Sequence, residues 1–493
     1  MVSLPQLPFD QKHLFINNEW VESTGSATAV IENPDTGDTI ATVPAGTADD
    51  VSCAVDAAYE AFHHGPWVNE YTGSQRRDAI NALASLIEEK REEIELIESI
   101  NTGKPINDVR LEMDDVIDIL RFYAGYADKI HGRHISPQAN PTFEGYTAKV
   151  PVGVVAQINS FNYPAMLWAW KVAPALAAGC TIVFKPGPQT PLTTLYFGHL
   201  IKQTGKFPPG VYNVVVGGVD VGQALVDNDK VDKVGFTGSV ATGKHVIKST
   251  ASTRDVRKVS VELGGKSPVV IMPDFDLDTA AETVIAAVTS NTGMNCNCGS
   301  RAWIHRDIYD QMMPKLKAAA ERIAMGVPQE ETTVMGPLID RRQCERVLEY
   351  IRIGKEEDKA ELLVGGERAF DRGHWVKPTV FVNVDPKARI ATEEIFGPVL
   401  SVLKPFDSLD EVIAIERKND FGLAAAIFSH SPRDIAKFTR ALRNGTIWVN
   451  TFNILFASLP FGGFRNSGFG RELGEESLEG YLEVKTIITD VTV

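Results

Sequence analysis

The chain has 493 residues, too many for one hydrophobic core, so two or more packed domains are expected. It is 44% hydrophobic and 23% charged, as is usual for a globular protein. A formal charge of -15 argues against non-specific binding to nucleic acid or to an acidic membrane surface. Five cysteines, few and odd in number, favour free thiols in a reducing compartment over a disulfide framework.

The start of the chain, MVSLPQLPFDQKHLF, has no basic segment followed by an apolar one, and it is not rich in Arg and Ser. The most apolar stretch, residues 172–184, is broken by Pro174 and Gly179 well short of a membrane span. We therefore expect a cytoplasmic protein without a membrane partner.

The first part of the chain predicts short strands and then acidic, Ala-rich helices. Gly103 followed by Pro105 indicates the end of a helix. The expected strands cover residues 14–21, 29–34 and 38–44, and the expected helices include 48–62 and 76–100.

From Pro151 onward, apolar strands alternate with helical patterns. This alternation predicts an α/β fold with a parallel, Rossmann-like sheet, in which ligands bind at the carboxyl ends of the strands. The expected strands are 152–158, 180–186, 212–218, 234–239, 257–265 and 268–272, with helices at 164–178, 192–205 and 240–250.

A second α/β region is expected between residues 266 and 465. Residues 481–493 alternate in the manner of a strand. The helical patterns of the second region are 279–290, 309–325, 341–356 and 432–443.

Cys296 lies in a loop of small and amide side chains, where a substrate can approach its sulfur closely. A thiolate adds to an aldehyde to give a thiohemiacetal, and loss of hydride then gives a thioester. The alternative is that Cys296 and Cys298 are buried small residues or metal ligands. A C-x-C pair without a second Cys or His pair is weak evidence for zinc, so no metal is expected. Cys298 could form a transient disulfide with Cys296 or be an ordinary small residue.

Glu262 ends an apolar strand where two glycines turn the chain. An apolar cleft would raise the pKa of this carboxyl towards the range of a general base, although a solvated strand-end glutamate is the ordinary alternative. The segment 236–243, FTGSVATG, follows a strand and opens a helix whose free amides suit a phosphate. It lacks the G-x-G-x-x-G pattern, so this signal is weak by itself.

Taken together, these segments resemble the aldehyde dehydrogenase superfamily nearly from end to end. The motifs that carry the resemblance are 160–164 (SFNYP), 184–186 (FKP), 236–239 (FTGS), 259–268 (VSVELGGKSP), 291–301 around Cys296, 393–399 (EEIFGPV) and 460–468 (PFGGFRNSG). The family's own cofactor fingerprint also lacks G-x-G-x-x-G.

The resemblance implies three parts. These are a Rossmann-like cofactor domain (1–128 and 152–263), an α/β catalytic domain (264–465) and a β-rich oligomerisation element (129–151 and 480–493). It also implies a homo-oligomer, either a dimer or a tetramer, that takes a small-molecule aldehyde as substrate and NAD or NADP as cofactor.

The resemblance also implies residue roles. Cys296 matches the nucleophile, Glu262 the general base, Asn162 the side-chain donor of the oxyanion hole, and Lys171 a lysine that helps to relay protons from the glutamate. The matching cofactor residues are Ile158, Asn159, Lys185, Pro188, Gly238, Ser239, Gly243, Leu263, Glu394 and Phe396. The matching substrate residues are Tyr163, Met166, Trp170, Met294, Phe452, Leu455 and Phe461.

Pro188 stands where many NAD-preferring members carry a glutamate that repels a 2′-phosphate. Proline has no charge, so we expect NADP to be tolerated or preferred, with Lys185 pairing with the phosphate. The alternative is that Pro188 only shapes the turn and that NAD still binds.

The expected substrate is an apolar or aromatic aldehyde, because aromatic and apolar residues occupy the matching tunnel positions and no Arg or Lys does. A betaine-type aldehyde held in an aromatic cage is an alternative. Glu262 favours hydrolysis to a free acid over transfer to coenzyme A. An alternative of another class is a catalytically lapsed protein that binds cofactor or serves a structural role.

Overall fold

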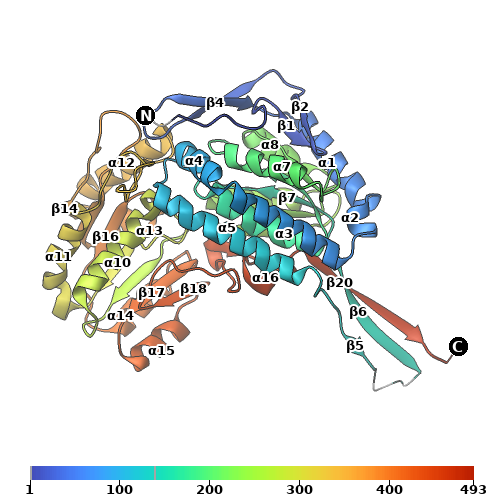
Figure 1. Cartoon of the computed structure of the whole chain (residues 1–493). Helices are drawn as coiled ribbons and strands as arrows, with labels where there is room; N and C mark the ends of the chain where they lie inside the picture. Colours follow the sequence, from blue (N-terminus) through green and yellow to red (C-terminus); the bar gives the residue numbers. More distant parts are fainter. Residues whose placement is uncertain (1–2, 138–139, 141, 493) are drawn as a thin grey trace.

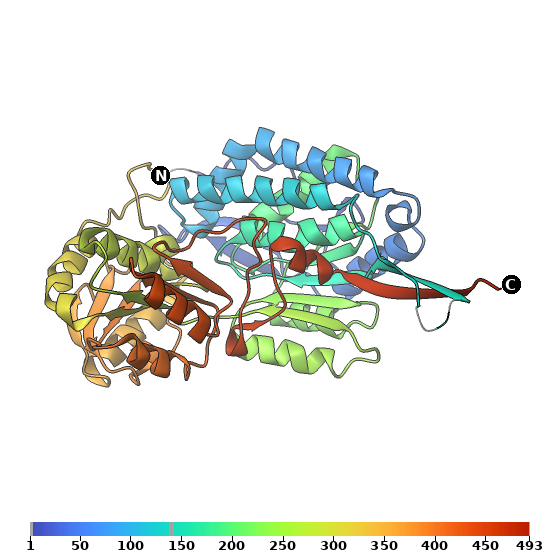
Figure 2. The same ribbon diagram turned by 90° about the horizontal axis from the view of Figure 1, so that it is seen from below.

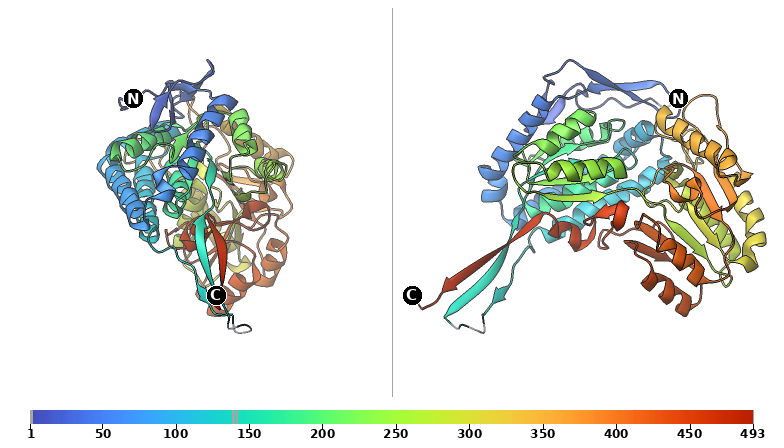
Figure 3. Two further views of the ribbon diagram at one scale, coloured as in Figure 1. Left: turned by 90° about the vertical axis from the view of Figure 1, so that its right-hand side faces the viewer. Right: turned by 180° about the vertical axis from the view of Figure 1, so that it is seen from behind.

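The computed structural model describes residues 3–137, 140 and 142–492. Two α/β bodies lie side by side, and a slender β-arm projects from one of them (Figures 1 and 2). The N-terminal half and residues up to Glu262 build the first body, and most of the later chain builds the second. The C-terminal strand returns to the first body and runs out along the arm (Figure 3).

The first body contains an eight-stranded sheet in the order β19-β11-β10-β7-β8-β9-β1-β2. The strands from β11 to β9 pair in parallel, and β19 and β1 close the run antiparallel. The four strands from β10 to β9 are buried along their whole length, as is usual where helices cover both faces of a parallel sheet. The expectation of a Rossmann-like sheet is confirmed. The strand bounds are β1 (Leu14–Ile16), β2 (Glu19–Val21), β7 (Val154–Ile158), β8 (Thr181–Lys185), β9 (Tyr212–Val214), β10 (Lys233–Thr237), β11 (Lys258–Glu262) and β19 (Gly468–Phe469).

Helices pack on both faces of this sheet (Figure 1). Their bounds are α1 (Ala48–His63), α2 (Pro66–Asn69), α3 (Gly73–Glu89), α4 (Arg91–Thr102), α5 (Ile106–Tyr126), α6 (Pro164–Ala178), α7 (Leu192–Thr204), α8 (Val219–Asp227), α9 (Val240–Thr250) and α16 (Gly474–Glu479). Gly103 ends α4 in the left-handed conformation, with φ 74°, as its position before Pro105 predicted. The single helix expected over 76–100 is wrong: the chain breaks at Lys90 into α3 and α4. No Gly or Pro marks this break, so the local sequence does not signal it.

The second body is built on a seven-stranded sheet in the order β14-β15-β16-β13-β12-β17-β18. All neighbours pair in parallel except β14. Its strands are β12 (Pro268–Ile271), β13 (Arg301–Ile304), β14 (Glu361–Val364), β15 (Thr379–Val384), β16 (Val399–Leu403), β17 (Ala424–Phe428) and β18 (Thr446–Val449). Its helices are α10 (Leu277–Thr289), α11 (Arg306–Glu321), α12 (Arg341–Glu356), α13 (Arg389–Thr392), α14 (Leu409–Glu416) and α15 (Pro432–Ala441), with short 3-10 turns η1 (Ser290–Gly293) and η2 (Arg465–Ser467).

The arm is a three-stranded antiparallel sheet in the order β20-β6-β5. Its strands are β5 (His134–Ile135), β6 (Phe143–Pro151) and β20 (Leu482–Asp490), and β20 pairs with β6 along its whole length. A separate hairpin joins β3 (Thr28–Glu32) and β4 (Thr39–Pro44). Residues 138, 139, 141 and 493 of the expected oligomerisation element lie outside the described residues. Within the described part of the chain, no helix is long and apolar enough to cross a bilayer.

Candidate active site

Three of the parallel strands of the first sheet end in a polar residue at their carboxyl ends, and the strand β7 between them ends in Ile158. Strand β7 ends at Ile158, β8 at Lys185, β10 at Thr237 and β11 at Glu262. Because these ends meet at one edge of the sheet, the four residues lie around one region, which is where ligands bind in open α/β sheets.

Cys296 reaches this edge from the second body, on the loop between α10 and β13. Residues Asn291, Thr292 and Gly293 adopt positive φ angles of 47°, 56° and 70°, so the loop turns sharply just before the thiol. A left-handed conformation is costly at Thr292, a β-branched residue, and persists only where contacts hold it. Here Thr292 donates to the carbonyl of Gly336 at 2.9 Å, and Asn291 donates to the carbonyl of Asn162 at 2.7 Å.

The Cys296 thiol and the Glu262 carboxyl lie beside each other. Burial raises the pKa of Glu262 to about 7, and the nearby Lys171 ammonium offsets part of this rise. Burial and the neighbouring Glu262 carboxylate raise the pKa of Cys296 well above its ordinary value. Neither oxygen of Glu262 has a hydrogen-bond partner of good geometry among the described residues. Near neutral pH the thiol therefore keeps its proton while a substantial part of Glu262 is ionised, so a base that can take the thiol proton is already in place.

Asn162 lies at the start of the loop that leads into α6. Its Nδ2 donates to the carbonyl of Met294 at 3.0 Å, which holds the amide close to the Cys296 loop. A primary amide carries two N–H groups, so one remains available to an oxygen that develops negative charge next to the sulfur.

Lys171 projects from the middle of α6 and is fully buried. Its ammonium donates to Thr237 Oγ1 at 2.7 Å and also bonds to the carboxylate of Glu472. Glu472 was not predicted, because it lies in a loop near the C-terminus and only the fold brings it to α6. The three side chains form a buried polar path that starts beside Glu262.

Two cavities meet at Cys296 and Asn162, since both residues line each cavity. The first cavity has a volume of about 370 Å³ and lies between the two bodies. Of the predicted cofactor residues, Gly238, Ser239, Leu263, Glu394 and Phe396 line it. Ile158, Asn159, Lys185, Pro188 and Gly243 are outside its lining.

The protein backbone that lines the first cavity suits a dinucleotide. Ser239 caps α9 and accepts from the Thr242 N–H at 3.3 Å, which leaves the other first-turn N–H groups directed out of the helix, as an anion requires. A Cβ atom on Gly264 would approach Glu394 Oε2 to 2.2 Å, so this narrow wall has no room for a side chain. Gly243 is packed in the same way against Leu263, which brings α9 close to the sheet.

Lys185 is buried at the end of β8, and burial lowers the pKa of its ammonium to about 8. Its only hydrogen-bond partner in the described part of the chain is the carbonyl of Pro186, at 3.3 Å. No carboxylate pairs with it there, and Pro188 nearby is exposed.

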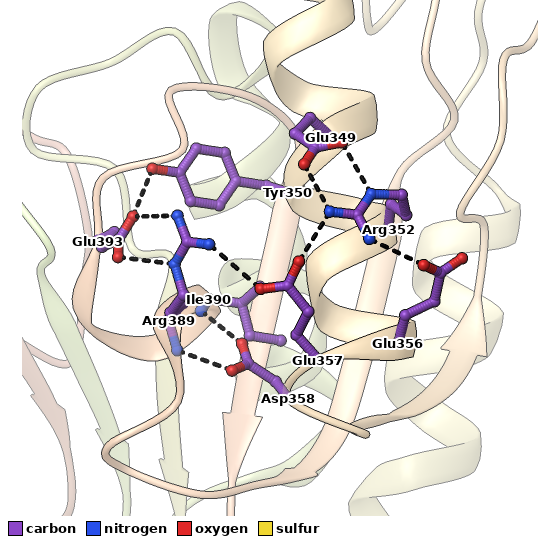
Figure 4. A network of polar contacts seen from close by, with 9 residues as sticks. All are labelled: Glu349, Tyr350, Arg352, Glu356, Glu357, Asp358, Arg389, Ile390 and Glu393. Atoms are coloured by element: carbon purple, nitrogen blue, oxygen red, sulfur yellow. Dashed lines mark hydrogen bonds and ion pairs between the residues drawn. The ribbon is translucent and has the colours of Figure 1, made fainter.

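Figure 4 shows a polar network on α12 and α13 that binds Glu393, the residue before Glu394. Arg389 and Tyr350 both bind the neighbouring Glu393 carboxylate, the tyrosine hydroxyl at 2.7 Å. Arg346 donates to the backbone carbonyl of Glu394 at 2.7 Å, and the Glu394 side chain accepts from the Gly265 N–H at 2.9 Å. Burial raises the pKa of Glu394 to about 7.

Residues at the start of α12 also line the first cavity, and none of them was predicted from the sequence. Asp340 caps α12 and accepts from Gln189 Nε2 at 3.0 Å, which ties the two bodies together across the cavity. An Asp directly before a helical pattern was a usable cap signal, but nothing local indicated which cavity it faces. The added lining residues are Gln189, Asp340, Arg342, Gln343 and Arg346.

The second cavity, here called the tunnel, has a volume of about 310 Å³ and opens on the other side of Cys296. The predicted substrate residues Tyr163, Met166, Trp170, Leu455 and Phe461 line it. Met294 and Phe452 do not: Met294 is buried in one core cluster of the second body and Phe452 in another. Cys298 also packs in that second body's core, and burial raises its pKa to about 12, so the structure places it as a buried thiol.

The buried Glu262 carboxyl makes stability depend on pH. Its pKa is about 7 in the fold, against an ordinary value of about 4.5, so the stability that it contributes is fully present below pH 4.5 and is lost as pH rises through 7. We predict that Glu262→Gln is more stable than the wild type at pH 8, by on the order of 3 kcal/mol, and nearly equal to it at pH 4.5. Denaturant midpoints across this range measure it, with the exposed Glu22→Gln as control. Equal pH slopes in wild type and Glu262→Gln would contradict it.

The sequence model of the Aldehyde dehydrogenase family matches residues 20–487. The chain is 43% identical over 490 residues to the mitochondrial aldehyde dehydrogenase of Sus scrofa, covering 99% of this chain and 92% of that protein. Aldehyde dehydrogenase 1 of Tanacetum cinerariifolium is also 43% identical, with 97% of this chain and 95% of that protein covered. Because some relatives are described as mitochondrial, the cytoplasmic location stays a prediction.

Solved structures agree with the sequence relatives. An NAD+ complex of aldehyde dehydrogenase from Bacillus cereus matches with a TM-score of 0.95 at 41% identity, covering 99% of this chain and 100% of that chain. Betaine aldehyde dehydrogenase from Staphylococcus aureus, in complex with NAD+, matches with a TM-score of 0.95 at 37% identity, covering 98% and 95%. With its nearly complete match in sequence and fold, the chain belongs to the aldehyde dehydrogenase family and is an NAD(P)-dependent oxidoreductase that acts on aldehydes.

Proposed function

We propose that this enzyme oxidises its aldehyde to a free carboxylic acid through a thioester on Cys296. The observation that carries the proposal is that Cys296 and Asn162 stand where the two cavities meet, with Glu262 beside the thiol. A carbonyl carbon bound at the sulfur is then reached by the tunnel on one side and by the cofactor cavity on the other.

Glu262 first takes the proton of the Cys296 thiol, and the thiolate attacks the carbonyl carbon to form a thiohemiacetal. The free N–H of the Asn162 amide and the backbone N–H of Cys296 stabilise the oxygen that becomes negative. A bound nicotinamide dinucleotide supplies the acceptor for the hydride, and the thiohemiacetal becomes a thioester. After the thiol proton has left Glu262, its carboxylate removes a proton from the water that attacks the thioester. The C–S bond then breaks, which releases the carboxylic acid and returns the Cys296 sulfur as the leaving group.

Lys171, Thr237 and Glu472 offer a route by which protons leave Glu262, because their polar groups are bonded to one another and Glu472 is partly exposed. The residues proposed to hold the cofactor are the Ser239 end of α9 for the pyrophosphate and Glu394 for the ribose next to the nicotinamide. Phe396 would lie against the ring.

The tunnel wall formed by Tyr163, Trp170 and Phe461 suits an apolar or aromatic aldehyde. A betaine-type aldehyde is a second candidate, because the same rings can hold a quaternary ammonium by cation–π contact. The lapsed, purely binding protein is the alternative of another class, and its sign would be cofactor binding without turnover.

We predict that Cys296→Ser abolishes aldehyde oxidation and that Glu262→Gln lowers kcat by about 100-fold or more, since general base catalysis typically contributes 100- to 10,000-fold. Initial rates of reduced-nicotinamide formation over a panel of aldehydes measure this. Cofactor binding by each variant, followed by calorimetry, is the control for folding. A Cys296→Ser enzyme that retains a substantial part of the rate would overturn the thioester route.

We also propose that the enzyme accepts NADP. Lys185 lies buried without a paired carboxylate, so an added phosphate would restore the charge that burial disfavours. At the neighbouring turn, Pro188 brings no negative charge to repel that phosphate.

The matched variants Pro188→Glu and Pro188→Gln test this, because they differ only in charge. We expect Pro188→Glu to lower kcat/KM for NADP relative to NAD by about tenfold, or about 1.4 kcal/mol, and Pro188→Gln to change the ratio little. Wild-type kcat/KM values that favour NAD by more than about tenfold would show that Pro188 only shapes the turn.

The arm is proposed to join subunits into a dimer or tetramer. Strand β20 is an edge strand that carries exposed apolar side chains, among them Val484 and Ile488, and Tyr146 on β6 is exposed as well. An open edge with apolar side chains is usually covered in a stable protein, and a second copy of the sheet would cover it.

A further inference from the structure

The tunnel has an acidic side that the sequence analysis did not foresee. Four carboxylates line it, all on helix α5: Asp108, Glu112, Asp114 and Asp115. No Lys, Arg or His is among its described lining residues. A cavity with this imbalance favours a ligand of positive charge and repels an anionic one.

Two of the four charges are already compensated inside the protein. Glu112 is buried and forms an ion pair with the Lys104 ammonium. Asp114 is exposed and pairs with Arg91 at 2.6 Å. Their contribution to the tunnel's charge is therefore small.

Asp108 and Asp115 have no directly bonded partner: neither side chain has an ion pair or a hydrogen bond within the described part of the chain, and each is partly buried. Burial raises the pKa of both carboxyls to about 6. The Lys104 ammonium offsets part of the rise at Asp108, and the Glu112 carboxylate adds to the rise at both. Both are ionised at neutral pH, so the fold keeps two partly desolvated negative charges on the tunnel wall.

The acidic residues of α5 and the Cys296 thiol line the same tunnel. Residues 108, 112 and 115 follow a spacing of four and three, so they share one face of α5, and α5 packs along α6. Tyr163 lies just before α6, and after burial the charges of Asp108, Glu112 and Cys296 all raise its pKa. The Lys104 ammonium makes a cation–π contact with the Tyr163 ring, with Nζ 4.2 Å from the ring centroid. This contact holds the ring near both the carboxylates and the sulfur.

A second observation points to a ligand that donates hydrogen bonds. Asn297 lines the same tunnel and is 1% exposed, and its Oδ1 has no partner among the described residues. A buried amide oxygen without a donor is costly, and a donor carried by the substrate would remove this cost.

We propose that the tunnel selects an aldehyde that carries a protonated amine, with its carbonyl at Cys296 and its ammonium group at Asp108 and Asp115. This rests on the proposed function, because it uses the same tunnel and thiol. A protonated amine is favoured over a quaternary ammonium, since only the former can donate hydrogen bonds to unpaired carboxylates. Trp170 and Phe461 line the tunnel as well and suit the carbon chain between the two ends.

The test compares charged and neutral aldehydes of equal shape: 3-aminopropanal with butanal, and 6-aminohexanal with heptanal. We expect the wild type to favour the amine in at least one pair by about tenfold in kcat/KM. Asp108→Asn with Asp115→Asn should reduce that preference by about tenfold through KM, while the neutral aldehyde changes little. Asp118→Asn is the matched control, because Asp118 is an exposed residue of α5 that does not line the tunnel.

The outcomes separate the two proposals. Turnover of none of these aldehydes would count against the proposed function itself. Good turnover of the neutral aldehydes without preference for the amines would overturn the amine subsite alone. A preference that survives in the double variant would also overturn the assignment to Asp108 and Asp115. So would a stronger preference for 4-trimethylammoniobutanal over 5,5-dimethylhexanal that the double variant leaves unchanged, since it would place the selection on the aromatic wall.

Discussion

Burial of the Glu262 carboxyl beside the Cys296 thiol, with no cation bonded to either among the residues that the structure describes, is the constraint on which the rest of the site depends. The nearest ammonium, on Lys171, is turned towards Thr237 and Glu472 and not towards Glu262. Burial therefore raises the pKa of Glu262 to about 7, so its ionised form is a stronger base than an ordinary carboxylate and can take the thiol proton. The same burial that makes both groups costly to charge makes each a strong base or nucleophile once charged.

Helix α6 carries this constraint into the fold. Its first turn is held by two buried carboxylates, since Ala165 N–H donates to Glu98 at 3.4 Å and Met166 N–H donates to Glu112 at 3.0 Å. Negative charge at a helix N-terminus is favourable, and here it also fixes the loop that presents Asn162. Helix α6 thus positions both the Asn162 amide, just before its start, and Lys171, two turns later. Two parts of the proposed mechanism therefore depend on one helix.

Much of the candidate site could be placed from the sequence, because Glu262 ends a predicted strand and Cys296 lies in a contiguous loop motif. The parallel sheets followed from the alternation after Pro151, and Glu262 and Cys296 from their local surroundings together with the family resemblance. What escaped prediction depends on tertiary packing. The sequence of α5 gives no sign of a binding role for its acidic residues. Only the packing of α5 on α6 shows that Asp108 and Asp115 line the tunnel. Glu472 lies about three hundred residues from Lys171 in sequence, and Met294 turns into a core because the loop reverses at Thr292.

The thioester on Cys296 is tested most directly by trapping it. In the first turnover of the wild type, the acyl group should be bound to the enzyme after the hydride has left and before water hydrolyses the thioester. Acid quenching after mixing with aldehyde and cofactor, followed by fragmentation mass spectrometry, would locate the added mass. The account predicts the acyl group on Cys296 and none on Cys298. An enzyme that releases reduced cofactor at the wild-type rate without any acylated Cys296 would contradict it.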